Sequence, residues 1–229
     1  VENGATTSYK DVNADVFSVG VTYTYKIRAY AKSDENVTYG DWSEEKSVCR
    51  KLDAPVLTTT DFNYQSATLS WEQVADAEGY VIYRKSSGES DYSKLTTITG
   101  ALALSYQDKS VVTGETYQYY AVAYCKSNNT TQYSDNSNTV KVKPLLAQTV
   151  VSLSDITITS VTVNWNKIDG ADGYAVYRAT SKDGDYTKIA TLESANKKNY
   201  TDSEIKTAKT YYYKVRAYRL INGKKVFAP

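Results

Sequence analysis

The chain has 229 residues and a net charge of +1, with 41% hydrophobic and 23% charged residues. This composition excludes a disordered chain, and the interspersed charges give no electrostatic support for binding nucleic acid. Histidine is absent, which excludes Ser-His-Asp triads, Cys-His dyads and histidine metal sites. No apolar run approaches the ~18 residues of a membrane span. The 23 tyrosines, against three phenylalanines, favour half-buried β-strands.

One stretch occurs three times, as residues 22–30, 116–124 and 210–218, at a spacing of 94 positions. A fixed period of this kind indicates an array of modules. Apolar and polar residues alternate in each copy, which predicts a half-buried strand. In the third copy we expect one face to carry Tyr211, Tyr213, Val215 and Ala217, and the outward face to carry Tyr212, Lys214, Arg216 and Tyr218.

Measured against this period, residues 1–50 are predicted to be the C-terminal half of a module. Strands are expected near 8–11, 22–30 and 42–48. Three strands alone are marginally stable in water. We therefore expect the chain to be a piece of a longer polypeptide.

Residues 51–144 are predicted to form a complete module. The expected strands are 56–60, 67–71, 80–84, 92–98, 104–106, 117–124 and 138–142, with a polar loop at 126–132. Alternation places Trp71 in the core. About seven short strands with no helical period predict an all-β fold, a seven-stranded antiparallel β-sandwich.

Residues 145–229 are predicted to form a second such module that lacks its last strand. Trp165 takes the core position of Trp71, whereas Ala208 stands where the earlier module has Gly114, so a different corner turn is possible there. The joints at 46–54 and 141–148 contain no run of Gly or Ser and are not flexible-coil linkers. The sequence therefore predicts tandem sandwiches arranged as a semi-rigid, extended rod.

Several motifs together resemble fibronectin type III modules. They are Trp71, the stretch Gly79-Tyr80-Val81-Ile82-Tyr83-Arg84 with its repeat at 173–178, and Gly114-Glu115-Thr116-Tyr117. The Gly-Tyr-x-[Val/Ile]-Tyr-Arg form is similar to versions on bacterial secreted and cell-surface proteins. The resemblance implies that Tyr23, Tyr117 and Tyr211 are tyrosine-corner residues, each with its hydroxyl bonded to nearby backbone. The Arg-Gly-Asp tripeptide of the family is absent.

A Tyr/Arg-rich face is the candidate binding surface, because Tyr and Arg are enriched in interface hot spots. Its residues are Arg28, Tyr30, Trp42, Tyr120, Tyr124, Tyr212, Arg216 and Tyr218. Trp42 could stack on a sugar or on Arg28. The competing interpretation is that cross-strand aromatic pairs stabilise the sheet without any ligand.

Cys49 lies in the first joint and Cys125 near the end of the repeated strand. A disulfide between them would close a loop of about 76 residues and stabilise the fold by ~4 kcal/mol. The alternative is two free thiols.

Together these observations predict a non-catalytic spacer or stalk of a larger bacterial protein, secreted or anchored to the cell wall. Alternatives are an adhesin or carbohydrate-binding module using the Tyr/Arg-rich face, or the non-catalytic part of a secreted glycan hydrolase or peptidase. The expected partners are neighbouring domains of the same polypeptide, with a host protein or glycan as a further possibility. We expect no cofactor, metal site, nucleic-acid partner or membrane insertion in this segment.

Overall fold

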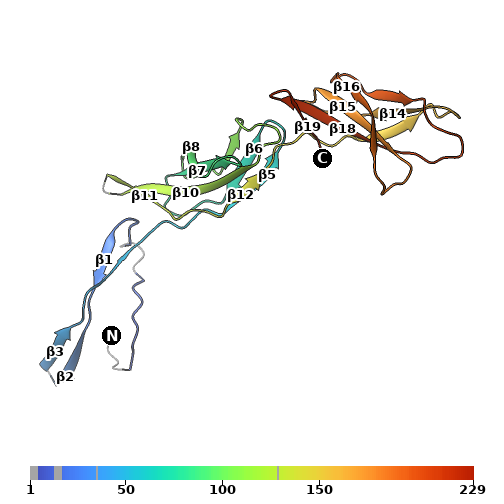
Figure 1. The fold of residues 1–229 in the computed structure, drawn as a ribbon. Coiled ribbons are helices and arrows are strands. Elements are labelled where there is room, and N and C mark those ends of the chain that lie inside the picture. The colour runs from blue at the N-terminus through green and yellow to red at the C-terminus, as the bar shows by residue number, and fades with distance from the viewer. Residues whose placement is uncertain (1–4, 13–16, 35, 128) are drawn as a thin grey trace.

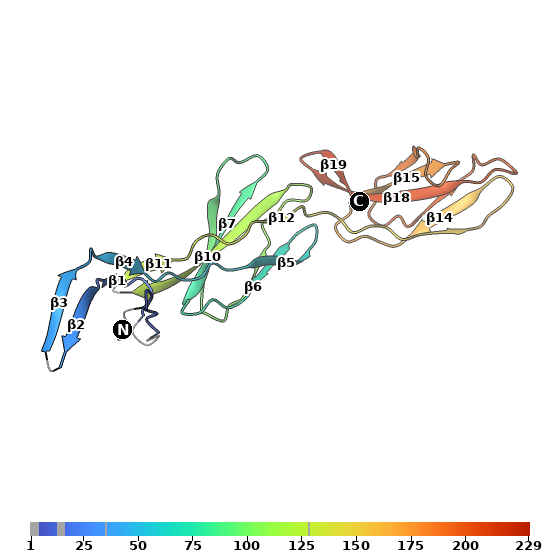
Figure 2. The same ribbon diagram turned by 90° about the horizontal axis from the view of Figure 1, so that it is seen from below.

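A computed structural model describes residues 5–12, 17–34, 36–127 and 129–229. In these ranges every regular element is a β-strand and every pairing is antiparallel. No helix that could cross a membrane is present among them. Three groups of strands follow one another along the molecule (Figure 1), and the extended arrangement is seen again after rotation (Figure 2). The all-β class predicted from the sequence is confirmed.

The N-terminal strand group contains β1 (Thr22–Tyr25), β2 (Arg28–Ser33), β3 (Asn36–Trp42) and β4 (Lys46–Cys49). The middle sandwich contains β5 (Leu57–Phe62), β6 (Ala67–Trp71), β7 (Gly79–Ser86), β8 (Ser93–Thr99), β9 (Ser105–Asp108), β10 (Tyr117–Ser127), β11 (Thr130–Tyr133) and β12 (Val140–Val142). The C-terminal sandwich contains β13 (Val151–Ser154), β14 (Val161–Trp165), β15 (Gly173–Ala179), β16 (Thr187–Leu192), β17 (Asn199–Asp202), β18 (Tyr212–Ile221) and β19 (Lys224–Phe227).

In the middle sandwich the sheet β5-β6-β9 faces the sheet β11-β10-β7-β8, whose central strand β10 also pairs with β12. The inward residues of both sheets form one apolar core. Trp71 is 5% exposed and Tyr119 is fully buried, so alternation along β6 and β10 directs their large rings inward. Two opposed sheets around such a core define a sandwich.

The C-terminal sandwich repeats this plan. The sheet β13-β14-β17 faces the sheet β16-β15-β18-β19, and a second core contains Trp165, Tyr174 and Val176. In both sandwiches the strand carrying Gly-Tyr-x-[Val/Ile]-Tyr-Arg, β7 or β15, pairs with the repeated strand, β10 or β18.

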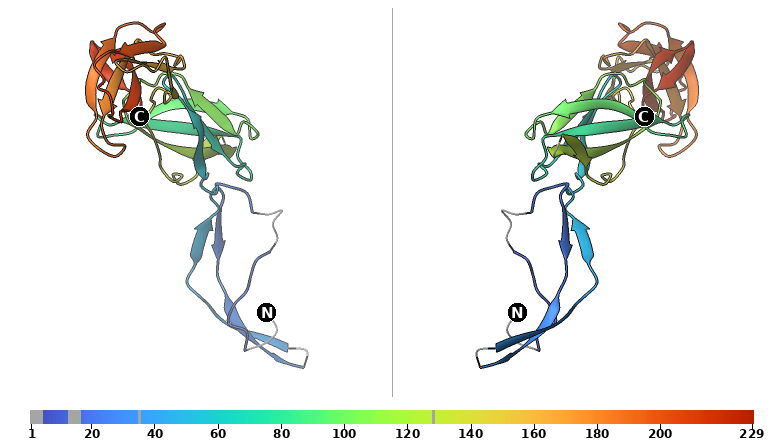
Figure 3. Two further views of the ribbon diagram at one scale, coloured as in Figure 1. Left: turned by 90° about the vertical axis from the view of Figure 1, so that its right-hand side faces the viewer. Right: turned by 90° about the vertical axis from the view of Figure 1, so that its left-hand side faces the viewer.

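The N-terminal strand group has the pairing pattern of β10 with β11 and β12. β1 pairs with β4 and β2 with β3, and Tyr23 opposes Val48 as Tyr117 opposes Val142. Almost all of its strand residues are exposed. Figure 3 shows this group extending away from the two sandwiches.

The predicted polar loop at 126–132 is wrong. β10 continues to Ser127, and β11 begins at Thr130 and pairs with it, so the polar residues lie on a tight hairpin. Asn129 has a φ of 60°, a turn conformation that Asn tolerates better than most residues. Threonine also fits an exposed edge strand, so polarity alone did not distinguish loop from strand here.

The corner turn before β18 keeps the conformation of its counterparts despite Ala208. Gly20 and Gly114 have φ values of 78° and 90°, and Ala208 has a φ of 59°. The different turn considered from the sequence does not occur. Alanine is left in the left-handed region, which costs an L-residue with a side chain about 1–2 kcal/mol.

Candidate functional surfaces

The repeated tyrosines form one structure three times. The hydroxyl oxygens of Tyr23, Tyr117 and Tyr211 each accept a hydrogen bond from the backbone N–H of the residue five positions earlier, at 2.9, 3.0 and 3.1 Å. Each bond fixes the turn that precedes the repeated strand. The turns before Tyr23 and Tyr117 lie beside a joint, because Gly20 and Gly114 in these turns donate to the joint backbone.

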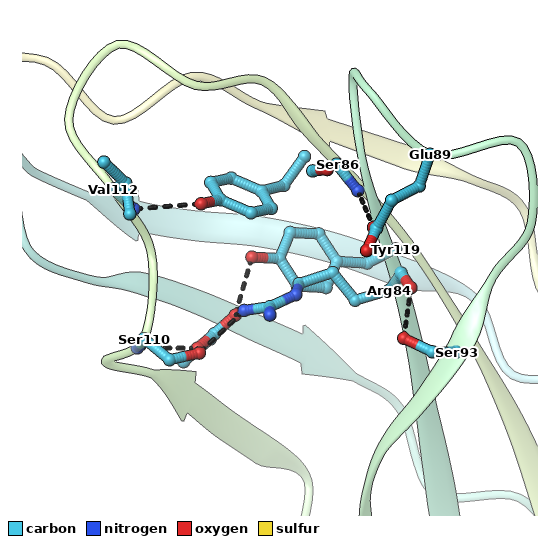
Figure 4. A network of polar contacts seen from close by, with 9 residues as sticks. Arg84, Ser86, Glu89, Ser93, Ser110, Val112 and Tyr119 are labelled. Atoms are coloured by element: carbon cyan, nitrogen blue, oxygen red, sulfur yellow. Dashed lines mark hydrogen bonds and ion pairs between the residues drawn. The ribbon is translucent and has the colours of Figure 1, made fainter.

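A buried ionic network lies between the two sheets of the middle sandwich (Figure 4). The Arg84 guanidinium donates to the carboxylate of Asp108 at 2.7 Å, and the Tyr119 hydroxyl donates to the same oxygen at 2.9 Å. The second carboxylate oxygen accepts from the backbone N–H and hydroxyl of Ser110, at 2.9 and 2.7 Å. Asp108 is 1% exposed. A charge buried this deeply requires such partners.

The C-terminal sandwich contains the same network. Arg178 donates to both carboxylate oxygens of Asp202 at 3.0 and 2.9 Å, and the Tyr213 hydroxyl donates at 2.8 Å. The backbone N–H of Glu204 donates at 3.0 Å. Asp108 and Asp202 were not predicted from the sequence, although they are separated by 94 positions and each follows a repeated tyrosine by two residues.

These contacts determine the protonation states of the aspartates and tyrosines in the two networks. Burial raises the pKa of Asp108, but hydrogen bonds from Ser110, Arg84 and Tyr119 outweigh it and leave that pKa below its usual value. The pKa of Asp202 is lowered in the same way against the same burial effect. Burial and the adjacent carboxylate raise the pKa of Tyr119 well above the ordinary tyrosine value. The carboxylates therefore stay ionised and the phenols stay protonated at neutral pH.

The Tyr/Arg-rich face is less exposed than its alternation predicts. Tyr124 and Tyr218 are 9% and 1% exposed, because each lies over a glycine of the paired strand. A Cβ atom at Gly79 would lie 2.7 Å from the Tyr124 hydroxyl, and one at Gly173 would lie 2.5 Å from the Tyr218 hydroxyl. Both tyrosine rings thus cover the sheet at its glycines, and the prediction that these two residues lie on an outward face is wrong.

The other members of this face on the two sandwiches are engaged within it. Tyr120 stacks on Tyr83 with centroids 4.8 Å apart and planes at 11°, and Tyr92 meets it edge-on at 4.8 Å. Arg216 is half-buried and donates to the carbonyl of Ala228. Tyr212 is half-buried on β18. Cross-strand packing therefore accounts for most of this surface.

The N-terminal strand group carries an exposed cation–aromatic stack. The Arg28 guanidinium lies 3.6 Å from the ring centroid of Tyr39 and 4.4 Å from that of Trp42. Tyr30 meets Tyr39 at 6.3 Å, and Trp42 is 52% exposed. Among the residues of the predicted face, Arg28, Tyr30 and Trp42 are the most exposed.

Cys49 and Cys125 are free thiols, so the disulfide considered from the sequence is not formed. Cys125 packs into the core of the middle sandwich, whereas Cys49 is exposed on β4, where it pairs with Thr22. Burial, together with the charges of Glu78 and Asp76, raises the pKa of Cys125. A raised pKa makes that thiol less reactive.

The joints begin later than the sequence predicted, because β4 extends to Cys49 and β12 to Val142. The first joint (residues 50–56) and the second joint (residues 143–150) share the same backbone contacts. In the first, the N–H of Gly20 donates to the carbonyl of Arg50 at 2.9 Å; in the second, the N–H of Gly114 donates to the carbonyl of Pro144 at 2.8 Å. Leu52 and Leu146, also 94 positions apart, are buried in the core of the following sandwich.

Side chains complete each joint differently. At the first, Arg50 pairs with Asp76 at 2.5 Å and Gly20 lies against the side chain of Gln132. At the second, Gly114 lies against the methyl groups of Val226.

A ring from the middle sandwich also enters the second joint. Tyr64 packs against the core of the C-terminal sandwich, and its edge lies so close to Gly170 that a Cβ atom there would overlap it. The Arg219 guanidinium lies over the same ring, 4.9 Å from the centroid of Tyr64.

No protein-family model matches the chain. It is 37% identical over 94 residues to an amylopullulanase of Thermoanaerobacter thermohydrosulfuricus, a match covering 40% of this chain and 6% of the relative. It is 24% identical over 243 residues to exoglucanase B of Cellulomonas fimi, covering 95% of this chain and 20% of the relative. The chain therefore spans a small part of the curated relatives it matches.

Among solved structures, the chain is similar to a segment of two fibronectin type III domains from chicken tenascin. The match has 19% identity and a TM-score of 0.46, and it covers 77% of this chain and 98% of that chain. A second similar structure contains domains FN1 to FN3 of chicken CNTN1, with 17% identity, a TM-score of 0.33, and coverage of 90% and 72%.

Proposed function

We propose that this chain is a non-catalytic, semi-rigid spacer within a larger extracellular bacterial protein that acts on polysaccharides. The observation that carries the proposal is the repeated joint, in which a corner glycine bonds to the joint backbone and a buried leucine anchors the next sandwich. Such a joint fixes the position of one module relative to the next. A flexible linker contains no such contacts.

The relatives support the proposed type of parent protein. Amylopullulanase and exoglucanase are names of enzymes that act on polysaccharides, and the matched region is a minor part of each. The role of a segment of this kind would be to hold another domain at a set distance. The ionic networks and tyrosine corners would keep each sandwich folded outside the cell.

Small-angle X-ray scattering of the purified chain tests the spacer. The expected result is an elongated particle whose largest dimension matches the end-to-end arrangement of Figure 1. A variant with eight Gly/Ser residues inserted between Pro144 and Leu145 is the control, and its distance distribution should broaden. A compact wild-type particle, or a wild-type profile as broad as that of the insertion variant, would contradict the proposal.

A second candidate function is supported by the exposed stack of Arg28, Tyr39 and Trp42, which could contact a protein or glycan. It predicts that Trp42→Ala abolishes binding to the ligand of the parent protein and leaves the scattering profile unchanged.

A further inference from the structure

The second joint contains a polar cleft with a volume of about 640 Å³, within the usual size range of ligand sites. It is lined on one side by the β5–β6 turn, by Gln107 of β9 and by residues that follow β9, and on the other by the end of β18. Ligand sites occur preferentially at interfaces between domains.

The charged residues of the lining are both cations. Lys109 comes from the middle sandwich and Arg219 from the C-terminal sandwich, and no carboxylate is among the described lining residues. The Lys109 ammonium has no hydrogen-bond or ion-pair partner within the described ranges, and the contact found for Arg219 there is the ring of Tyr64. The side chains of this cleft therefore give it a local positive charge, in a chain whose net charge is only +1.

The uncharged part of the lining suits a ligand with many hydroxyl groups. The side-chain amides of Gln65 and Gln107 are exposed, and each can donate and accept at once, as a sugar hydroxyl does. Apolar surface is also present, from Val112 and Ile221, against which the C–H groups of a sugar ring can pack. The two cations are thus accompanied by neutral donor–acceptor groups and apolar surface, a combination that favours an acidic sugar over an acidic peptide.

The repeat shows that the fold does not require these residues. At the corresponding positions 94 residues later, Gln65, Gln107 and Lys109 are replaced by Thr159, Thr201 and Ser203. The counterpart of Arg219 in the middle sandwich is Cys125. The residues of the ionic network, in contrast, recur unchanged as Arg, Asp and Tyr. The cleft is thus particular to the second joint.

We propose that this cleft binds a uronic acid unit of an acidic polysaccharide. The carboxylate lies between the Lys109 ammonium and the Arg219 guanidinium, whose fork can bind both carboxylate oxygens. The ring hydroxyls bond to Gln65 and Gln107. This proposal is independent of the spacer role, because a semi-rigid joint needs no ligand.

Isothermal titration calorimetry of the whole chain with tetragalacturonate tests the proposal. We expect saturable 1:1 binding that weakens as salt rises, because the cations are exposed. Lys109→Gln should weaken binding about tenfold, the loss of one charged hydrogen bond. Lys94→Gln, the same substitution at an exposed position of β8 on the other sheet, should leave the affinity unchanged.

Arg219→Gln should weaken binding at least as much as Lys109→Gln, but Arg219 also contacts Tyr64 and could alter the joint. Lys109→Gln therefore decides the test, and thermal melting confirms that each variant is folded. Absence of binding, equal binding of the fully methyl-esterified tetramer, or equal loss in Lys94→Gln would overturn the proposal. Equal affinity for a tetraglutamate peptide would also overturn it, by assigning the cleft to acidic peptides.

Discussion

The ionic networks of the two sandwiches repeat residue by residue, whereas the two joints repeat only in their backbone. Arg84 and Asp108 recur as Arg178 and Asp202 with the same contacts. The joints share their glycine-to-carbonyl hydrogen bond and a buried leucine. Their lateral contacts differ, with an ion pair and a glutamine at the first, and a valine and an inserted tyrosine ring at the second.

This difference separates what the fold needs from what distinguishes one joint from the other. A buried charge that loses its partner is strongly destabilising, so every module must keep the complete network. Exposed contacts between modules contribute little individually. They can vary as long as the backbone contact sets the geometry of the joint.

The largest expected effect comes from breaking a network. Asp108→Ala should lower the free energy of unfolding of the middle sandwich by about 3–5 kcal/mol, because it leaves Arg84 without a carboxylate and removes the acceptor of the buried Tyr119 hydroxyl. Asp202→Ala should have the same effect in the C-terminal sandwich. Urea denaturation followed by tryptophan fluorescence measures both.

Asp183→Ala, at an exposed turn, is the control for these variants and should change stability by less than about 0.5 kcal/mol. Equal small effects at all three positions would show that the networks do not stabilise the sandwiches.

Acid should weaken both interiors. The pKa values of Asp108 and Asp202 are lower in the folded chain than their ordinary value. Their stabilisation is therefore present above the ordinary aspartate pKa of about 4 and is lost as the pH falls below it. The midpoint of urea unfolding, measured from pH 7 to pH 2, should be nearly constant at first and then drop. The double variant Asp108→Asn, Asp202→Asn should show a flatter acid limb, and an unchanged limb would refute this origin.

Substitution of the corner glycines should destabilise the chain by intermediate amounts that differ between the two joints. Gly114→Ala should cost about 2 kcal/mol, since it adds left-handed strain and a contact 2.8 Å from a Val226 methyl carbon. Gly20→Ala should cost about 1 kcal/mol, because the side chain of Gln132 can move away.

The reverse substitution, Ala208→Gly, should stabilise the C-terminal sandwich by about 0.5–1 kcal/mol. Thermal melting measures the three variants, and a different order of their stabilities would contradict this explanation.

The smallest effect is expected from the ion pair of the first joint. Asp76→Asn removes the charge that pairs with Arg50 and leaves the hydrogen bond from Arg50 to the carbonyl of Phe17 in place. Both side chains of the pair are substantially exposed, so stability should change by less than about 1 kcal/mol. The difference in stability between this variant and the wild-type chain should be smaller still in 0.5 M salt. A loss of several kcal/mol in thermal melting would instead make this pair a principal stabiliser of the joint.

The repeat made much of the fold predictable. The period of 94 and the alternation along the repeated stretch indicated strands, core tryptophans and the order of modules. Alternation could not show that Tyr124 and Tyr218 would be covered, because that depends on the register that places each ring over a glycine. The ionic networks were hidden for a similar reason, since Arg84 and Asp108 meet only when two sheets pack together. The joint cleft was unpredictable because two modules build it.

The central claim, that the joints fix the relative position of the modules, can be measured by pulsed electron resonance between two spin labels. The labels are placed at Lys94 and Lys188, exposed and equivalent positions on β8 and β16, in a Cys49→Ser, Cys125→Ala background. A semi-rigid joint predicts one narrow distance distribution, which broadens when Gly/Ser residues are inserted after Pro144. A broad distribution in the chain without the insertion would contradict the account.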